Sequence, residues 1–194
     1  MLRVGKSGKA KAGKSNSELV RHLLTRASDR IALPSGAGFV YGNAEEGGFY
    51  RPLHDEADLP ELIAKLPELL ASERLGLLHH QWALSRAGYA SLTSFLDLLP
   101  ALARETDADV LRAVIGPCDH LIDHADVAGP GVRESLQAFV AEIWKPALVD
   151  LGYDRRDGDD DDTRLRRAEL YALVASLAED DDATREVEAR CRAY

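Results

Sequence analysis

The hydrophobic pattern of the chain changes near Leu59, and this change constrains the fold more than any other feature. Apolar residues after that point recur at spacings of three and four, which places them on one face of a helix. The first such set is Leu59, Leu62, Ile63, Leu66, Leu69 and Leu70. Before it, turn residues cut the chain into short apolar runs, a pattern typical of strands. We therefore predict a mainly α fold preceded by a short β-strand segment.

Residues 56–194 are expected to form about seven consecutive helices. Ser72 and Ser91 are placed to cap two of them, and Gly152 follows the longest. Pro100 and Pro117 should kink or interrupt the helices that contain them. Consecutive antiparallel helices that each bury one face against their neighbours form an α-solenoid, so we expect a HEAT-like array, although no residue repeat of fixed period is visible.

The residues before this array fall into two segments. Residues 1–18 are expected to be a flexible basic segment, because residues 1–14 hold five basic side chains and no acidic one. Residues 19–55 are expected to form a β-strand segment that is part of a larger domain, since a small isolated sheet needs something to pack against. The expected strands are Leu19–Thr25, Arg30–Leu33, Phe39–Tyr41 and Phe49–Leu53.

Charge and composition exclude several classes of protein. The formal net charge is −9, from 33 acidic and 24 basic residues, so the summed field opposes nucleic acid and anionic membranes as partners. The longest uncharged run in the apolar middle of the chain is Leu75 to Ser85, which is too short to span a bilayer. No secretory signal is readable, and Cys118 and Cys191 make no disulfide framework, so a cytoplasmic location is expected.

A phosphate-binding loop pattern occurs at Gly8–Ser15, with Lys14 and Ser15 after its second glycine. Such a loop needs a buried strand before it and a helix after it, so that backbone N–H groups converge on the phosphates. Only Met1–Val4 precede the pattern, and the helical remainder offers no parallel sheet. A nucleotide-binding enzyme is therefore the weakest interpretation, and a flexible stretch the simpler one.

Two further patterns resemble metal sites. His120 and His124 lie one helical turn apart and could share a metal ion with Cys118 or an aspartate, but Leu121 occupies the place of the general-base glutamate of a hydrolytic zinc helix. They are weak metal candidates. The acidic run Asp157–Asp162 lacks the glycine and the glutamate of a calcium loop. No catalytic residue can be nominated from spacing alone.

Four segments, in order, resemble aminopeptidase N-like zinc metallopeptidases, in the region where a β-sandwich domain leads into a carboxy-terminal helical domain. The segments are Gly42–Arg51, Glu73–Gly88, Arg164–Ala168 and Glu179–Tyr194. The first of them contains an Asn, a turn of small residues and then a Gly-aromatic-Tyr-Arg strand. The resemblance covers residues 19–194. Pro52 and His54 depart from the usual family pattern.

This resemblance implies the non-catalytic end of such an enzyme. The family's zinc helix, with His-Glu-x-x-His, and its Gly-x-Met-Glu-Asn loop are missing from the chain. The chain should therefore not hydrolyse peptides alone. It should also hold no cofactor, because the zinc of the family lies in the catalytic domain. The implied partners are a peptide and a catalytic domain, in cis or in trans. Candidate substrate-binding residues are Tyr50, Arg51, Arg164 and Arg167, because an Arg fork binds a carboxylate.

The alternative is a free-standing helical-repeat adaptor that binds a protein on a concave face. The surface of residues 19–55 separates the two hypotheses. An apolar face exposed there would mean that the strands need a further partner.

Overall fold

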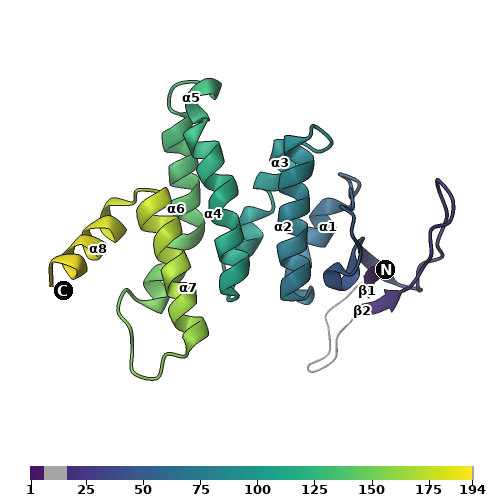
Figure 1. Cartoon of the computed structure of the whole chain (residues 1–194), viewed down its shortest axis with the longest axis horizontal. Coiled ribbons are helices and arrows are strands. Elements are labelled where there is room, and N and C mark those ends of the chain that lie inside the picture. The colour runs from purple at the N-terminus through teal and green to yellow at the C-terminus, as the bar shows by residue number, and fades with distance from the viewer. Residues whose placement is uncertain (7–16, 194) are drawn as a thin grey trace. The chain divides into compact units, whose positions relative to one another are not determined.

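A computed structural model describes residues 1–6 and 17–193 of the chain, which divides into two compact units, Met1–Ala101 and Leu102–Tyr194 (Figure 1). The first unit combines a small antiparallel sheet with short helices, and the second is helical. The prediction of a mainly α chain with a leading strand segment is confirmed. A solenoid array remains a prediction. No helix of the described residues is both long and apolar enough to span a bilayer.

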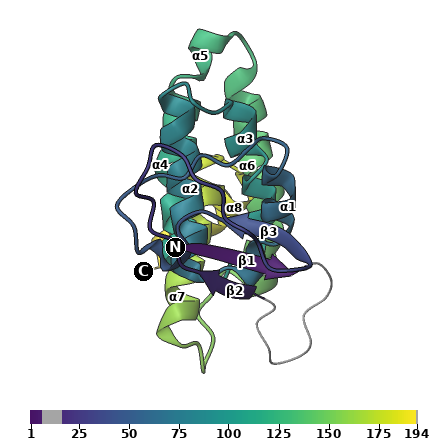
Figure 2. The same cartoon turned by 90° about the vertical axis from the view of Figure 1, so that its right-hand side faces the viewer.

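The sheet has the strand order β2-β1-β3, with β1 (Leu2–Lys6) between β2 (Ser17–Val20) and β3 (Ala37–Tyr41) (Figure 2). Both pairings are antiparallel. Val4 is buried at the centre, and Phe39 and Tyr41 of β3 are buried by the two-residue alternation of a strand. The sheet thus presents one apolar face to the helices of its own unit.

The prediction that residues 1–18 form a flexible segment is wrong for Leu2–Lys6, because these residues form the central strand of the sheet. An apolar Val4 that pairs on both sides outweighs the basic composition around it. The strands expected at Arg30–Leu33 and Phe49–Leu53 are also absent, because neither segment pairs with a neighbour.

The phosphate-loop pattern Gly8–Ser15 lies wholly among residues 7–16, outside the described part of the chain. Its flanks are described, and they are β1 and β2, which pair with each other antiparallel. The chain therefore continues from the pattern into a strand, where a phosphate-binding loop would continue into a helix.

The helices of the first unit follow a turn of 3₁₀-helix, η1 (Ala44–Glu46). They are α1 (Leu59–Ala64), η2 (Leu66–Glu68), α2 (Ala71–Arg86) and α3 (Leu92–Leu96), followed by η3 (Leu99–Leu102) at the junction of the units. Ser91 caps α3 by accepting a hydrogen bond from the Ser94 backbone at 3.1 Å, as expected. The expected cap at Ser72 is wrong, because α2 begins at Ala71 and Ser72 lies inside it. Leu62, Leu77 and Phe95 are buried and form the core with the sheet.

The second unit consists of α4 (Ala108–Asp123), α5 (Ala125–Ala128), α6 (Val132–Leu151), α7 (Asp161–Tyr171), the π-helix η4 (Ala172–Leu177) and α8 (Asp181–Ala193). Figure 1 shows α4, α6 and α7 side by side. Trp144 and Leu148 of α6 are fully buried, with Val114 of α4 and Leu173 of η4. Pro117 lies inside α4 without ending it.

Candidate functional site

A polar turn connects β3 to the helices and contains the first motif of the family resemblance. The Asn43 side chain closes it: its Nδ2 donates to the Gly48 carbonyl at 3.0 Å, and its Oδ1 accepts from the Gly48 backbone at 2.8 Å. Glu45 and Glu46 have φ angles of 60° and 51°, in the left-handed region that non-glycine residues rarely adopt. Such strain persists only where surrounding contacts hold it in place.

The Glu46 carboxylate is one of these contacts, and it lies directly over α2. It accepts hydrogen bonds from the Tyr41 hydroxyl and from Asn43 Nδ2, and it lies 3.0 Å from His80 Nε2. It can approach α2 this closely because Gly76 has no side chain: a Cβ there would come within 2.2 Å of the carboxylate. Burial and Glu46 together raise the pKa of Tyr41, so its hydroxyl stays protonated as a donor.

A second carboxylate, Glu73, joins three parts of this unit and is completely buried. Arg3 Nε of the central strand lies 2.7 and 2.8 Å from its two oxygens. The carboxylate also accepts from the Glu45 backbone at 2.8 Å and from the Leu70 backbone at 3.0 Å. The buried charge is therefore paired and hydrogen-bonded, as a charge in such a position must be.

A hollow of about 360 Å³ opens above this network. It is lined by Glu46, Gly48, Phe49, Tyr50, Arg51, Gly76, His79 and His80. Phe49 is fully exposed and Tyr50 is half exposed, with the Tyr50 hydroxyl donating to the Gly42 carbonyl at 2.8 Å. Burial and the neighbouring His80 lower the pKa of His79. The hollow thus combines exposed aromatic rings, an arginine and imidazoles, groups that bind the backbone and carboxyl groups of peptides.

The structure brings two of the four predicted substrate-binding residues together and places the other two in the second unit. Tyr50 and Arg51 line the hollow. Arg167 is buried in α7, where its guanidinium donates to the Gly152 carbonyl at 2.9 Å and to Asp159 at 2.8 Å. Arg164 pairs with Asp161 at 2.9 Å, one turn away on the same helix.

His120 and His124 have their ring centroids 4.3 Å apart, and His124 Nδ1 lies 2.8 Å from the His120 carbonyl. Cys118 is buried, and burial raises its pKa to about 12, so its thiol stays protonated. Residues 1–6 and 17–193 contain no group of three or more His, Cys, Asp or Glu side chains placed to hold a metal ion.

Sequence reasoning missed the network beneath the hollow. The basic composition of residues 1–14 predicts a flexible segment around Arg3, and Glu46 and Glu73 are far apart in the chain. One signal was present: Gly76 interrupts a helix-forming run, and a glycine inside a helix often marks a close approach.

Residues 39–194 match the model of the ERAP1-like C-terminal domain, and the chain belongs to this family, a C-terminal domain of M1 aminopeptidases.

Several full-length relatives are aminopeptidases. The chain is 31% identical over 141 residues to aminopeptidase M1-A of Oryza sativa subsp. japonica, covering 70% of the chain and 16% of that protein. It is 25% identical over 173 residues to endoplasmic reticulum aminopeptidase 2 of Homo sapiens (84% and 17%) and 26% identical over 166 residues to aminopeptidase M1 of Arabidopsis thaliana (84% and 19%). The chain thus spans less than a fifth of the length of these relatives.

Proposed function

We propose that this chain is the non-catalytic C-terminal domain of a zinc aminopeptidase, where it encloses the peptide substrate and packs on the catalytic domain. The observation that carries the proposal is the family match over residues 39–194, in a chain whose sequence contains no His-Glu-x-x-His helix. The zinc and the chemistry would then belong to the catalytic domain, and this chain would contribute binding and orientation.

Exposed apolar side chains between residues 19 and 55 support the packing role. Leu23 is 81% exposed, Leu24 61% and Leu53 56%, and Phe49 is fully exposed. Exposed apolar side chains that gather into one patch mark a surface that contacts a partner. This exposure favours a domain that packs against a catalytic domain over a free-standing adaptor.

Within this role, Tyr50 and Arg51 bind the carboxyl end of the peptide. Arg51 lines the hollow beside two exposed aromatic side chains and can approach a carboxylate as a planar fork. Arg164 and Arg167 act structurally, because each is paired with an aspartate of its own unit.

Fluorescence anisotropy with a labelled nonapeptide tests this assignment, using the peptide once with a free C-terminal carboxylate and once with a C-terminal amide. Arg51→Gln should weaken binding of the free acid roughly tenfold, the scale of a charge-assisted hydrogen bond, and leave the amide unchanged. Arg164→Gln is the control and should change neither. Loss of free-acid binding in Arg164→Gln, with Arg51→Gln unaffected, would move the carboxylate site to α7.

A further inference from the structure

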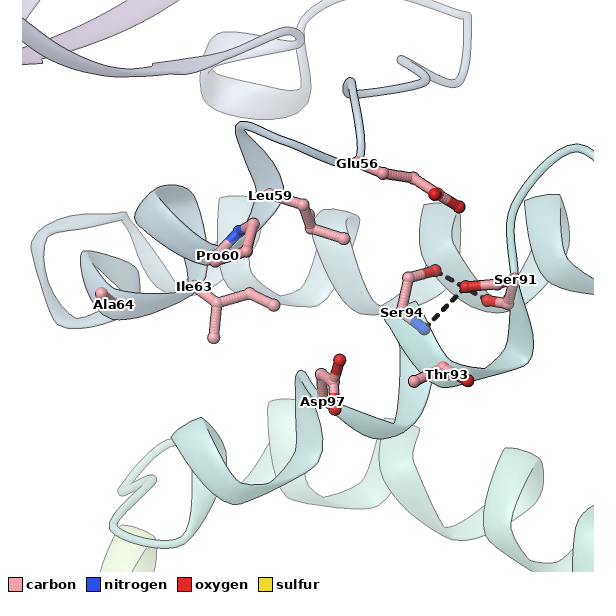
Figure 3. A pocket seen from close by; sticks show the side chains of 9 residues that line it. All are labelled: Glu56, Leu59, Pro60, Ile63, Ala64, Ser91, Thr93, Ser94 and Asp97. Carbon is pink, nitrogen blue, oxygen red and sulfur yellow. Dashed lines mark hydrogen bonds between the residues drawn. The ribbon is translucent and has the colours of Figure 1, made fainter.

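A second hollow in the first unit differs in chemistry from the one beside Arg51. Its volume is about 480 Å³, within the range of small-molecule sites. It is lined by Glu56, Leu59, Pro60, Ile63, Ala64, Ser91, Thr93, Ser94 and Asp97. Figure 3 shows the residues of α1 on one side and those of α3 on the other.

The α1 side of this hollow is apolar. Leu59 is 5% exposed, and Pro60 and Ile63 stand beside it on α1. On the α3 side, Ser94 is buried, its hydroxyl donates to the Ser91 carbonyl at 2.7 Å and its backbone N–H to the Ser91 hydroxyl at 3.1 Å. Both bonds are drawn in Figure 3. The serine groups are thus occupied with each other, which leaves an aliphatic surface for the body of a ligand.

The charged groups of the lining are all acidic. Glu56 and Asp97 line the hollow, and neither carboxylate has an ion-pair or hydrogen-bond partner among the described residues. No Lys, Arg or His is present in the lining. Lys65, at the end of α1, is paired with Glu68 at 2.9 Å. The charge of the hollow is therefore negative and uncompensated by its own walls, which favours a positively charged ligand.

We propose that this hollow binds a small organic cation, an ammonium group carried on an apolar body. The apolar body lies on Leu59, Pro60 and Ile63, and the ammonium group faces the acidic part of the lining, which Glu56 and Asp97 form. Burial of the apolar body contributes favourably to the free energy of binding, and the two carboxylates favour a ligand with a positive charge. The proposal does not depend on the peptide-binding role of Arg51, because the two hollows share no lining residue.

Titration of the ¹⁵N-labelled full chain with phenethylamine, followed by amide chemical shifts, tests the site. We expect saturable shifts grouped at Ile63, Thr93, Ser94 and Asp97. The neutral analogue 2-phenylethanol has the same apolar body and should bind at least about fivefold more weakly, the factor that about 1 kcal/mol of charge interaction gives. Equal affinity for the amine and the alcohol, or shifts scattered over the chain, would overturn the proposal.

Variants separate a built site from general attraction to an acidic protein. The double variant Glu56→Gln and Asp97→Asn should weaken phenethylamine binding by about fivefold or more and leave 2-phenylethanol binding unchanged. Glu61→Gln and Asp58→Asn together remove the same charge from α1 and its flank outside the lining, and should leave both affinities unchanged. Equal losses in the two double variants would mean that net charge alone attracts the amine, and would overturn the site.

A capped pentapeptide with one central lysine and amide-blocked ends distinguishes the source of the ammonium group. A free small cation as ligand predicts that phenethylamine binds and the peptide does not compete for the same shifts. If the peptide instead shifts the Ile63 and Ser94 amides and binds with higher affinity than phenethylamine, the ligand is a lysine side chain. That result would contradict the proposal as stated.

Discussion

Single residues in the first unit explain why a strained turn is held against α2. Glu46 adopts a left-handed backbone, and its carboxylate is fixed by Tyr41, Asn43 and His80. Gly76 leaves the space that the carboxylate occupies. The turn that leads to Tyr50 and Arg51 can therefore lie against α2 only because Gly76 has no side chain.

Gly76→Ala should lower the free energy of unfolding by about 1–3 kcal/mol, because the new Cβ displaces a carboxylate that three groups hold in place. Gly116→Ala is the matched control. A Cβ at Gly116 in α4 meets no atom within 4 Å, so alanine should stabilise by up to about 1 kcal/mol through helix propensity. Urea unfolding measures both. Stabilisation in both variants would contradict the account of Gly76.

His54 gives the first unit a pH dependence. Its ring stacks on Tyr41 at a centroid distance of 5.8 Å, and its Nε2 atom is buried without a hydrogen-bond partner. Burial, followed by the nearby His80, lowers the pKa of His54 from 6.5, while Asp58 opposes this effect. As the pH falls, His54 therefore binds a proton at a higher pH in the unfolded chain than in the folded chain. The stability of the fold decreases as the pH drops below about 6.5.

His54→Phe keeps an aromatic ring against Tyr41 and removes the titrating group. The urea midpoint of the variant, measured at pH 7.5, 6.5 and 5.5, should fall less steeply with acid than that of the original chain. Parallel pH profiles of the two proteins would show that His54 does not titrate in this way.

At the scale of elements, the helices were predictable and the strand pairing was not. The period of Leu59, Leu62 and Leu66 predicts burial of one helix face, and all three are buried. The predicted helix is too long, however, because α1 ends at Ala64, Leu66 belongs to the 3₁₀ turn η2, and Leu70 of the same set is exposed. The central strand has no such local signal, because Leu2–Lys6 become a strand by pairing with Ala37–Tyr41, far along the chain. The same limit applies to the candidate site: a motif points to Tyr50 and Arg51, whereas Glu46, Glu73 and Arg3 meet only in three dimensions.

Lys145 joins two elements of the second unit. Its ammonium group on α6 lies 2.8 Å from Asp180 and 2.9 Å from Asp182, at the start of α8. The hydrogen bond to Asp180, and then that to Asp182, raise the pKa of Lys145 to about 12. Asp180 also accepts from the Ala183 backbone at 3.0 Å and so caps the first turn of α8.

Lys145→Met should loosen α8 without unfolding the unit. Hydrogen exchange at the amides of α8 should become faster, while overall stability changes by about 1 kcal/mol or less, because the ion pairs are partly exposed. Arg185→Met is the control, since Arg185 pairs with Asp182 only inside α8 and should leave this exchange much less affected. Faster exchange in the control alone would contradict a role for Lys145.

At the scale of the whole molecule, the chain is a C-terminal helical domain of the M1 aminopeptidase family that spans less than a fifth of its full-length relatives. Its proposed contribution is binding and packing, with the chemistry placed in another domain. That division of labour is the central claim, and it concerns what the purified chain does when no catalytic domain is present.

Hydrolysis of a panel of aminoacyl-coumarin substrates by the purified chain, with added zinc and with zinc content measured by atomic absorption, tests this claim most directly. We predict no turnover above the rate without protein and no stoichiometric zinc. Turnover that follows bound zinc and is lost on chelation would contradict the account, and would make His120 and His124 the first residues to substitute.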